Sequence, residues 1–416
     1  MTLIVIVLTI ALLLLSWKYI LRLEPAGIFA VMWAFFAIAV TLLQNFIELR
    51  FLGGFYILCC IMVFVAGTIF SDNFYNPEPS GVTLEMRKQW VTPMLLVLII
   101  GALVNPIYSI ILHGFTLQAL LSMQDLLDMN NKIAVDRYAG SEATNVITQS
   151  FLIFSYAAPV IGGFCYRKVG RLNKTLCILT LVPGTFIALT QSMKMGMLTS
   201  FFLWFASYIV CSYSYGIPIR IKWKAILRFI LIVLGLFFVL FVSMVFRTGE
   251  ISERTILDIS QKFITYALGH MHCFDLWYTS YTPAELSWGS KTFMGITNLL
   301  GTEERVQGIY PEYVNIGKNG FYGISNVYTI FRPLIEDVGE AGTMLVMFVM
   351  GFAANWAMKS LEAHRYIFFT QVLLIAFFAY EMWSFVASFY AYTSYLAMFF
   401  LMYFLLRILQ KETAPC

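Results

Sequence analysis

Long apolar runs alternate with shorter polar connections along almost the whole chain. A helix needs about 20 apolar residues to cross the hydrocarbon core of a bilayer, and eleven runs approach or exceed that length. The runs are continuous rather than alternating, which favours helices over the strands of a β-barrel. We therefore predict an all-α polytopic membrane protein with about eleven transmembrane helices, within a range of 10–12. The runs cover residues 2–16, 27–46, 51–70, 91–113, 147–166, 174–191, 196–212, 226–246, 341–358, 366–383 and 384–406.

Two segments between the runs are too long and too polar to be simple connections. In residues 114–146, the stretch TLQALLSMQDLLDM spaces its leucines along one helix face, which predicts an amphipathic helix at the membrane interface. Residues 247–340 form a second segment of 94 residues, and loops of such length are usually functional. Within it, ILDISQKFITYALGHMHCFDLWY has a helical pattern, whereas NIGKNGFYGISN has the glycines and asparagines of a shaped loop. We treat residues 1–416 as a single integral membrane domain that carries both segments as loops.

The composition excludes several classes of protein. Apolar residues make up 60% of the chain and charged residues only 12%, about half of the roughly 25% that is usual in soluble domains. A soluble protein of this composition would expose more apolar surface than water tolerates. The chain is therefore not expected to be a soluble globular enzyme, a nucleic-acid-binding protein or a disordered protein, and its first partner is the lipid bilayer.

The distribution of positive charge predicts the orientation. Sixteen of the 27 Lys and Arg residues lie in connections of one parity, whereas the short connections of the other parity hold only four. An excess of Lys and Arg in short loops marks the cytoplasmic side. We therefore expect the N-terminus and both long loops, residues 114–146 and 247–340, on the outer side of the membrane.

Three basic residues lie at the outer ends of predicted helices. Arg247 follows the helix before the long loop, Arg332 shortly precedes the helix after it, and Lys194 is at the tip of a tight helical hairpin. Cations at this depth suit an anionic headgroup, and the planar fork of Arg binds phosphate or diphosphate through two hydrogen bonds. Interfacial Lys and Arg also extend to lipid headgroups in most membrane proteins, so each of the three has this alternative role.

Four carboxylates are candidate acids or bases. Glu336 and Asp337 follow Arg332 in FRPLIEDVGEAG, where a carboxylate could serve as a general base or could cap the helix that follows. Glu250 is a weaker candidate whose other role is that of a solvated loop charge. Glu381 lies within an apolar run near its outer end. An intramembrane carboxylate is costly and marks a candidate site, unless the side chain already reaches the interface.

Metal and cofactor chemistry is not expected from the sequence. His270 is a candidate acid or base, but His270 and His272 are two residues apart and would not face one another on a helix. The seven cysteines show no metal-ligand spacing, and no DxD, HExxH, GxSxG or P-loop pattern occurs. We therefore predict neither a metal site nor a cofactor.

The end of the long loop resembles a known family. The string SNVYTIFRPLIEDVGEAG, which covers Ser325–Gly342, is similar to the corresponding part of the Wzy-type polymerases that join O-antigen or capsule repeat units. The number of helices and the single large loop in the C-terminal third are similar as well. So are Arg247 at the start of that loop and the hairpin LTQSMKMGMLTS, which carries Lys194 near its tip.

The resemblance implies a glycosyltransferase-C-like fold in the bacterial inner membrane, with a large periplasmic loop between the helices that end near 246 and start near 341. It implies a metal-independent, inverting glycosyltransferase that joins undecaprenyl-diphosphate-linked oligosaccharides and releases undecaprenyl diphosphate. A chain-length regulator and a flippase are the implied protein partners. The residues that match these roles are Arg247, Arg332 and Lys194 for the diphosphate, Glu336, Asp337, His270 or Glu250 for the base, and Asn326 and Tyr328 for sugars.

Two other functions stay open. An O-antigen ligase uses the same donor with a lipid A-core acceptor, and His270 matches the loop histidine expected of ligases. A flippase or transporter of lipid-linked oligosaccharides would carry charges along the middles of its helices, and these are almost free of charge here. Residues 247–340 hold seven basic and eleven acidic residues, which favours an external active site over a central pathway.

Overall fold

The computed structural model describes residues 2–138, 146–191, 193–219, 222–248, 252–283, 285–301 and 310–413, and these residues are predominantly helical. The chain divides into two compact units. Unit 1 comprises Met1–Ser80 and Gln261–Leu396, and unit 2 comprises Gly81–Ser260 and Ala397–Cys416. Helix α11 (Glu253–Ser280) and helix α15 (Thr393–Leu409) each continue from one unit into the other.

Unit 1 is formed by the two ends of its sequence range, the N-terminal helices and the helices after α11. Besides its part of α11 and α15, it consists of α1 (Thr2–Arg22), α2 (Pro25–Leu42), α3 (Leu52–Phe74), α12 (Met294–Leu299), β2 (Val314–Asn315), β3 (Ile324–Ser325), α13 (Phe331–Glu362), α14 (Ile367–Trp383) and the 3-10 turn η2 (Phe389–Ala391).

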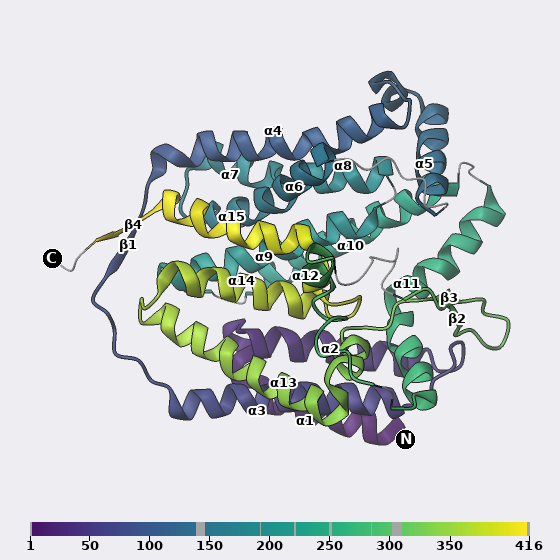
Figure 1. The fold of residues 1–416 in the computed structure, drawn as a ribbon, viewed down its shortest axis with the longest axis horizontal. Helices are drawn as coiled ribbons and strands as arrows, with labels where there is room; N and C mark the ends of the chain where they lie inside the picture. The colour runs from purple at the N-terminus through teal and green to yellow at the C-terminus, as the bar shows by residue number, and fades with distance from the viewer. Residues whose placement is uncertain are drawn as a thin grey trace. The chain divides into compact units, whose positions relative to one another are not determined.

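Helices α3 and α13 pack against each other in parallel, with their backbones in contact (Figure 1). A Cβ atom added to Gly351 would lie 1.9 Å from the carbonyl oxygen of Phe64, and one added to Gly67 would lie 2.1 Å from that of Phe348. Thr68 also donates a hydrogen bond to the Gly351 carbonyl, at 3.1 Å. Small residues permit such close approach between membrane helices, so these two glycines set the distance between the helix axes.

The first turns of α13 are set off from the rest of the helix by a kink. Gly339 has φ 75° and ψ 175°, a conformation that side chains with a Cβ rarely adopt. Next to the kink, the hydroxyl of Tyr56 in α3 donates to the Glu340 carbonyl at 2.8 Å. The segment from Phe331 to the kink can therefore follow its own direction, and this is the segment that carries the candidate site residues.

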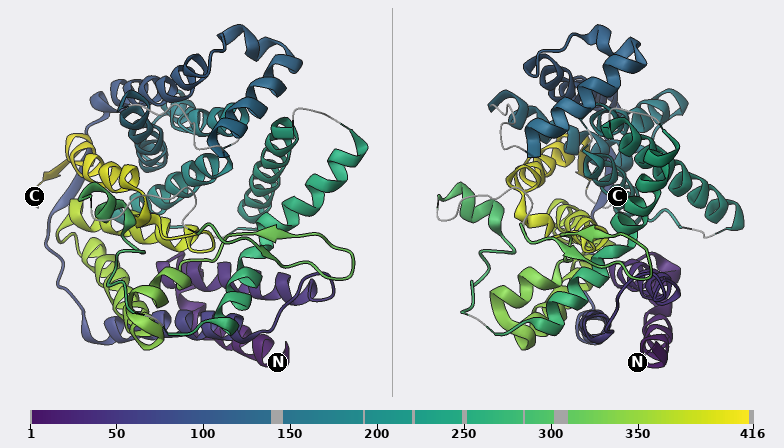
Figure 2. Two further views of the ribbon diagram at one scale, coloured as in Figure 1. Left: turned by 45° about the vertical axis from the view of Figure 1, so that its right-hand side comes forward. Right: turned by 90° about the vertical axis from the view of Figure 1, so that its right-hand side faces the viewer.

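The β2–β3 hairpin lies against the segment that connects α2 to α3 (Figure 2). Val314 pairs with Ser325 in the hairpin, and Asn319 and Gly320 at its turn have positive φ angles. Glu48 donates its backbone N–H to the Ile316 carbonyl at 2.8 Å. A buried apolar cluster connects the hairpin to α11. It contains Ile47, Cys273, Tyr310, Ile316 and Tyr328.

Unit 2 is built around α6, which packs against both α4 and α9. A Cβ atom added to Gly163 of α6 would lie 2.0 Å from the carbonyl oxygen of Trp204 in α9. Strands β1 and β4 pair antiparallel, with Thr83 opposite Thr413. The elements of unit 2 are β1 (Thr83–Met86), α4 (Lys88–Leu112), η1 (Leu117–Leu121), α5 (Met123–Tyr138), α6 (Val146–Cys165), α7 (Arg171–Leu179), α8 (Val182–Gln191), α9 (Lys194–Ser214), α10 (Trp223–Thr248) and β4 (Gln410–Thr413).

The chain is an α-helical, multi-pass membrane protein. In the part of the chain that the structure describes, nine helices are long and apolar enough to cross a bilayer, and the two shorter apolar helices are α14 and α15. The predicted count of about eleven therefore stays a prediction. The first run, 2–16, is part of the 21-residue helix α1, and the run 174–191 is divided between α7 and α8.

The structure changes some of the predicted boundaries. The helix expected at 341–358 is the part of α13 that follows the kink at Gly339, and a short helical segment from Phe331 precedes it. Pro333 lies in the first turn of that segment, where its missing N–H costs nothing. The helix expected at 384–406 begins only at Thr393, after η2. The amphipathic segment in 114–146 begins with the 3-10 turn η1 and continues as α5. The helix expected within 247–340 is present as α11, which extends over Glu253–Ser280.

An ion-pair cluster joins the α1–α2 turn to the C-terminal ends of α3 and α13. Arg22 pairs with Glu24 at 2.8 Å and with Glu362, while Lys359 pairs with Asp72 at 2.9 Å. Glu24 is only 4% exposed. This burial raises the pKa of Glu24 from 4.5 to about 7, and the nearby Arg22 guanidinium opposes the rise.

The α3–α13 contact predicts a large effect of one methyl group. Gly351→Ala should lower the melting temperature of the detergent-purified protein, because overpacking of this kind costs roughly 1–3 kcal/mol. The matched control is Gly235→Ala in the middle of α10, where an added Cβ meets no heavy atom within 4 Å. Equal melting temperatures for the two variants would contradict the proposed close packing.

The pKa of Glu24 predicts a pH-dependent stability. Because its pKa is raised in the folded state, Glu24 stabilises the fold fully below about pH 4.5, and this stabilisation is lost as the pH rises through about 7. Between pH 5.5 and 8.5 the loss should be about 2 kcal/mol, measured as a fall in melting temperature. Glu24→Gln should remove this dependence, whereas Glu85→Gln, at an exposed position in β1, should keep it. A Glu24→Gln protein with the wild-type pH dependence would show that another group titrates.

Candidate functional site

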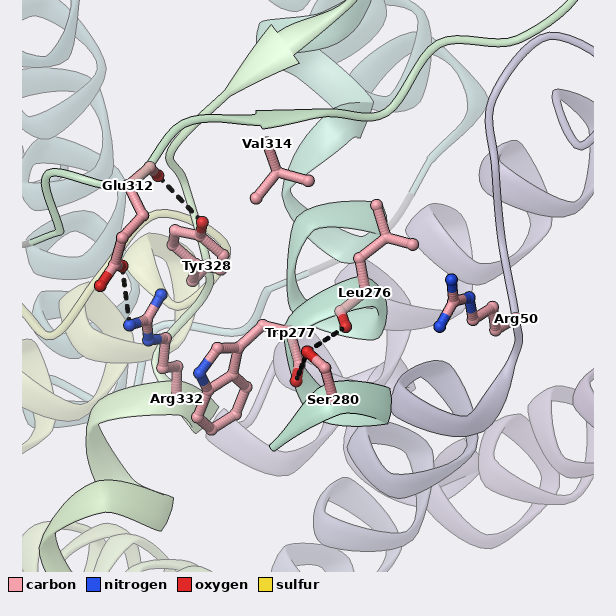
Figure 3. Close-up of a pocket in the computed structure, with 8 residues that line it drawn as sticks. All are labelled: Arg50, Leu276, Trp277, Ser280, Glu312, Val314, Tyr328 and Arg332. Atoms are coloured by element: carbon pink, nitrogen blue, oxygen red, sulfur yellow. Dashed lines mark hydrogen bonds and ion pairs between the residues drawn. The ribbon is translucent and has the colours of Figure 1, made fainter. Parts of the chain in front are cut away.

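A pocket of about 440 Å³ lies within unit 1 (Figure 3). It is formed where three parts of the unit meet: the start of α3, the end of α11, and the chain from the hairpin to the first turn of α13. Figure 3 shows Arg332 and Glu312 on one side of Trp277, and Arg50 on the other side, beyond Leu276 and Ser280. The lining residues are Arg50, Leu276, Trp277, Ser280, Glu312, Val314, Tyr328 and Arg332.

Arg332 is the central charge of this pocket. It is only 6% exposed, and a buried cation needs partners that replace its hydration. Two carboxylates supply them: Nε donates to Glu336 at 2.9 Å, and Nη2 donates to Glu312 at 2.8 Å. Aromatic rings cover the rest of the guanidinium group. Its central carbon lies 3.7 Å from the ring centre of Tyr310, 4.3 Å from that of Tyr328 and 5.1 Å from that of Trp277.

Tyr310 and Tyr328 also form hydrogen bonds to the two glutamates, Tyr310 to a carboxylate and Tyr328 to a backbone carbonyl. The Tyr310 hydroxyl donates to the second oxygen of Glu336 at 2.9 Å, and the Tyr328 hydroxyl donates to the backbone carbonyl of Glu312 at 2.9 Å. Burial raises the pKa of Tyr328 to about 12. It also raises the pKa of Tyr310 well above the ordinary range, with a further contribution from the Glu336 carboxylate. Both hydroxyls therefore remain donors at physiological pH. Asn326 donates to the Tyr310 carbonyl at 3.0 Å.

Arg50 is held in the pocket through its backbone. Asp275 of α11 accepts hydrogen bonds from the backbone N–H groups of Arg50, of Phe51 at 3.0 Å, and of Gly53 at 2.6 Å. These groups lie at the N-terminus of α3, where backbone donors lack partners within the helix. Burial raises the pKa of Asp275, and the three N–H donors oppose that rise. The Arg50 side chain is half exposed and lies 3.5 Å from Glu48.

Asp337 is next to Glu336 in sequence but has a different environment. Its carboxylate is buried and accepts hydrogen bonds from the Ser287 hydroxyl at 2.5 Å, from the Lys291 N–H at 3.0 Å and from the Thr292 N–H at 2.7 Å. These contacts fasten the segment 287–292 to the first turns of α13. We therefore assign Asp337 to the support of this segment and do not retain it as a candidate base.

His270 lies inside an aromatic cluster rather than in the pocket. Its ring centre is 4.4 Å from that of Phe36, 5.3 Å from that of Phe385 and 5.8 Å from that of Trp33. The side chain is 1% exposed, and neither ring nitrogen has a hydrogen-bond partner among the described residues. Burial lowers the pKa of His270 to about 3. The imidazole is therefore neutral and has no access to a substrate hydroxyl in this conformation.

The other predicted residues that the structure describes do not line the pocket. Lys194 is the first residue of α9 and Arg247 is in the last turn of α10, and both belong to unit 2. Glu381 is fully buried in α14, and its carboxylate oxygens have no hydrogen-bond partner among the described residues. Glu250 lies outside the described residues. Of the predicted charged residues, the structure therefore brings Arg332 and Glu336 together.

Sequence reasoning missed Arg50 and Glu312. Arg50 directly precedes the predicted helix 51–70, and Arg332 also lies shortly before a predicted helix; this similar position could have identified Arg50. No local pattern distinguishes Glu312 from the other acidic residues of the long loop. Within the part of the chain that the structure describes, no group of three or more His, Cys, Asp or Glu residues is arranged to hold a metal ion.

Comparison of the chain with known protein families, with curated proteins and with solved structures gave no match.

The contacts of Asp337 predict a structural role. Asp337→Asn places an amide N–H₂ group where a donor is already bound, so the free energy of unfolding should fall by about 1–3 kcal/mol. Thermal unfolding of the purified protein measures this change. Asp258→Asn, at an exposed position on α11, is the matched control and should unfold as the wild type does. An unchanged melting temperature for Asp337→Asn would leave its carboxylate available for another role.

Proposed function

We propose that the chain is a Wzy-type polymerase that joins lipid-linked oligosaccharide repeat units. In this proposal the growing glycan on one undecaprenyl diphosphate is transferred to the non-reducing end of a new lipid-linked unit, and undecaprenyl diphosphate leaves. The observation that carries the proposal is Arg332, a guanidinium group held by carboxylates and aromatic rings at the wall of a pocket in a multi-pass membrane protein.

Cations in the pocket support a leaving group that gains negative charge. As the bond between the anomeric carbon and the diphosphate breaks, charge develops on the diphosphate oxygens, and fixed donors placed there stabilise the transition state. Arg332 and Arg50 both line the pocket. Arg332 cannot be deprotonated under physiological conditions and offers its donors in a planar fork that matches phosphate oxygens. We assign Arg332 to the diphosphate and Arg50 to a second contact with it.

The remaining lining fits a sugar. Trp277 and Tyr328 present aromatic rings, Ser280 offers a hydroxyl and Glu312 a carboxylate. Carbohydrates combine apolar ring faces with hydroxyl edges, so aromatic surfaces with a few polar groups are the appropriate partners. The acceptor hydroxyl also needs a base, and the carboxylates nearest to Arg332 are those of Glu336 and Glu312. Asn326 holds the backbone of Tyr310, whose ring covers Arg332, by a hydrogen bond to the Tyr310 carbonyl.

The proposal places the pocket at the periplasmic face, following the distribution of Lys and Arg in the short loops. A chain-length regulator and a flippase remain proposed partners. His270 no longer supports the ligase alternative, because it is buried among aromatic rings. A ligase is therefore retained only as an outcome of the test.

The test is a lipopolysaccharide gel from the bacterium that carries the gene. Deletion of the gene should leave core with a single repeat unit, because polymerisation fails while ligation continues. Bare core with polymer still on the lipid carrier would identify a ligase and overturn the proposal.

Substitutions test the pocket itself. Arg332→Ala should abolish the long chains, since loss of one such donor lowers the rate by about 100–1,000-fold. Arg332→Lys keeps the charge without the fork and should give short chains only. Arg254→Ala, an exposed arginine on α11, should keep the full ladder. All variants must be present in the membrane at equal levels. A full ladder from Arg332→Ala would contradict the role of the pocket.

A further inference from the structure

Arg332 has two carboxylate partners and only one positive charge. Glu336 and Glu312 lie at 2.9 Å and 2.8 Å from different nitrogens of the same guanidinium group. This group of three side chains therefore carries a net negative charge. Both carboxylates also occupy donors of the guanidinium, Nε and Nη2. A diphosphate can therefore bind to these donors of Arg332 only if one carboxylate leaves it.

The two carboxylates differ in how firmly they are held. The Glu336 side chain is 21% exposed and also accepts a hydrogen bond from Tyr310. The Glu312 side chain is 60% exposed and lines the pocket. An ion pair with one partner so exposed to water contributes little. Glu312 is therefore the carboxylate that a ligand displaces most easily.

The Glu312 side chain can leave Arg332 without movement of its own backbone. The Tyr328 hydroxyl holds the backbone carbonyl of Glu312 at 2.9 Å, and this bond does not involve the side chain. Rotation about the side-chain bonds of Glu312 can release Arg332 while the backbone stays in place. The released carboxylate remains anchored at the pocket by its own backbone.

Resting on the proposed function, we propose that Glu312 occupies the diphosphate position on Arg332 in the free protein, and that on displacement it becomes the general base. The diphosphate of the donor replaces one carboxylate oxygen on the guanidinium. The freed Glu312 then takes the proton of the acceptor hydroxyl as that oxygen bonds to the anomeric carbon. The bond between the anomeric carbon and the diphosphate breaks, and its electron pair leaves with undecaprenyl diphosphate. Base activation is thereby coupled to the binding of the donor.

The coupling predicts opposite effects of one substitution on binding and on turnover. Glu312→Gln removes the competing charge, so the Kd of the purified protein for inorganic diphosphate should fall about two- to fivefold, measured by calorimetry. The same variant should lose the long chains on the gel, because it has no base. Glu336→Gln should instead weaken diphosphate binding, since Arg332 loses the carboxylate that fixes the direction of its Nε donor. Glu285→Gln, at an exposed position, should change neither readout.

Each outcome separates this inference from the proposed function. An unchanged or higher Kd for Glu312→Gln would overturn the displacement, and a full ladder from this variant would overturn its role as base. A full ladder from Arg332→Ala would instead overturn the proposed function. Farnesyl diphosphate should bind more tightly than uridine diphosphate; the reverse order would assign the pocket to a nucleotide sugar and also contradict the proposed function. Melting temperatures check the fold of every variant.

Discussion

The parallel packing of α3 on α13 is the contact on which the candidate site depends. Gly67 and Gly351 let the two backbones touch, and the parallel direction brings the N-terminal ends of both helices to the same end of the pair. Arg50 lies two residues before α3 and Arg332 is in the first turn of α13, so this contact helps to place both arginines at one pocket.

The charge balance of the pocket follows from the burial of Arg332. A guanidinium group removed from water requires both hydrogen-bond acceptors and polarisable surfaces, and Glu336, Glu312 and the surrounding rings supply them. The resulting cage fixes the direction of the donors, which is what preorganised stabilisation of a leaving diphosphate requires. It also neutralises the positive charge that would attract the ligand. We therefore propose that Glu312, the more exposed carboxylate, is displaced when the ligand binds.

Two site residues, Arg332 and Glu336, could be predicted from the sequence because they lie close together at the start of one helix. Arg332 and Glu336 are four residues apart, and the first turn of α13 brings them into contact. Asp337 shows the limit of such reasoning: it follows Glu336 directly, yet a helix turns each residue by about 100°, so its carboxylate faces the segment 287–292 instead. His270 was predicted as an acid or base, and its burial could not be foreseen. Its side chain packs against Trp33 and Phe385, which are far from it in the sequence.

The sequence by itself determined that this protein is α-helical and membrane-spanning, and that residues 247–340 hold 18 of its 50 charged residues. Those properties depend on runs of neighbouring residues, because in lipid the backbone N–H and C=O groups of a helix form hydrogen bonds within the same helix. Only the tertiary structure decided that Arg50 and Glu312 join Arg332 at the pocket. Arg50 and Glu312 are separated from each other by more than half of the chain, and only packing of α3, α11 and α13 against one another brings such residues together.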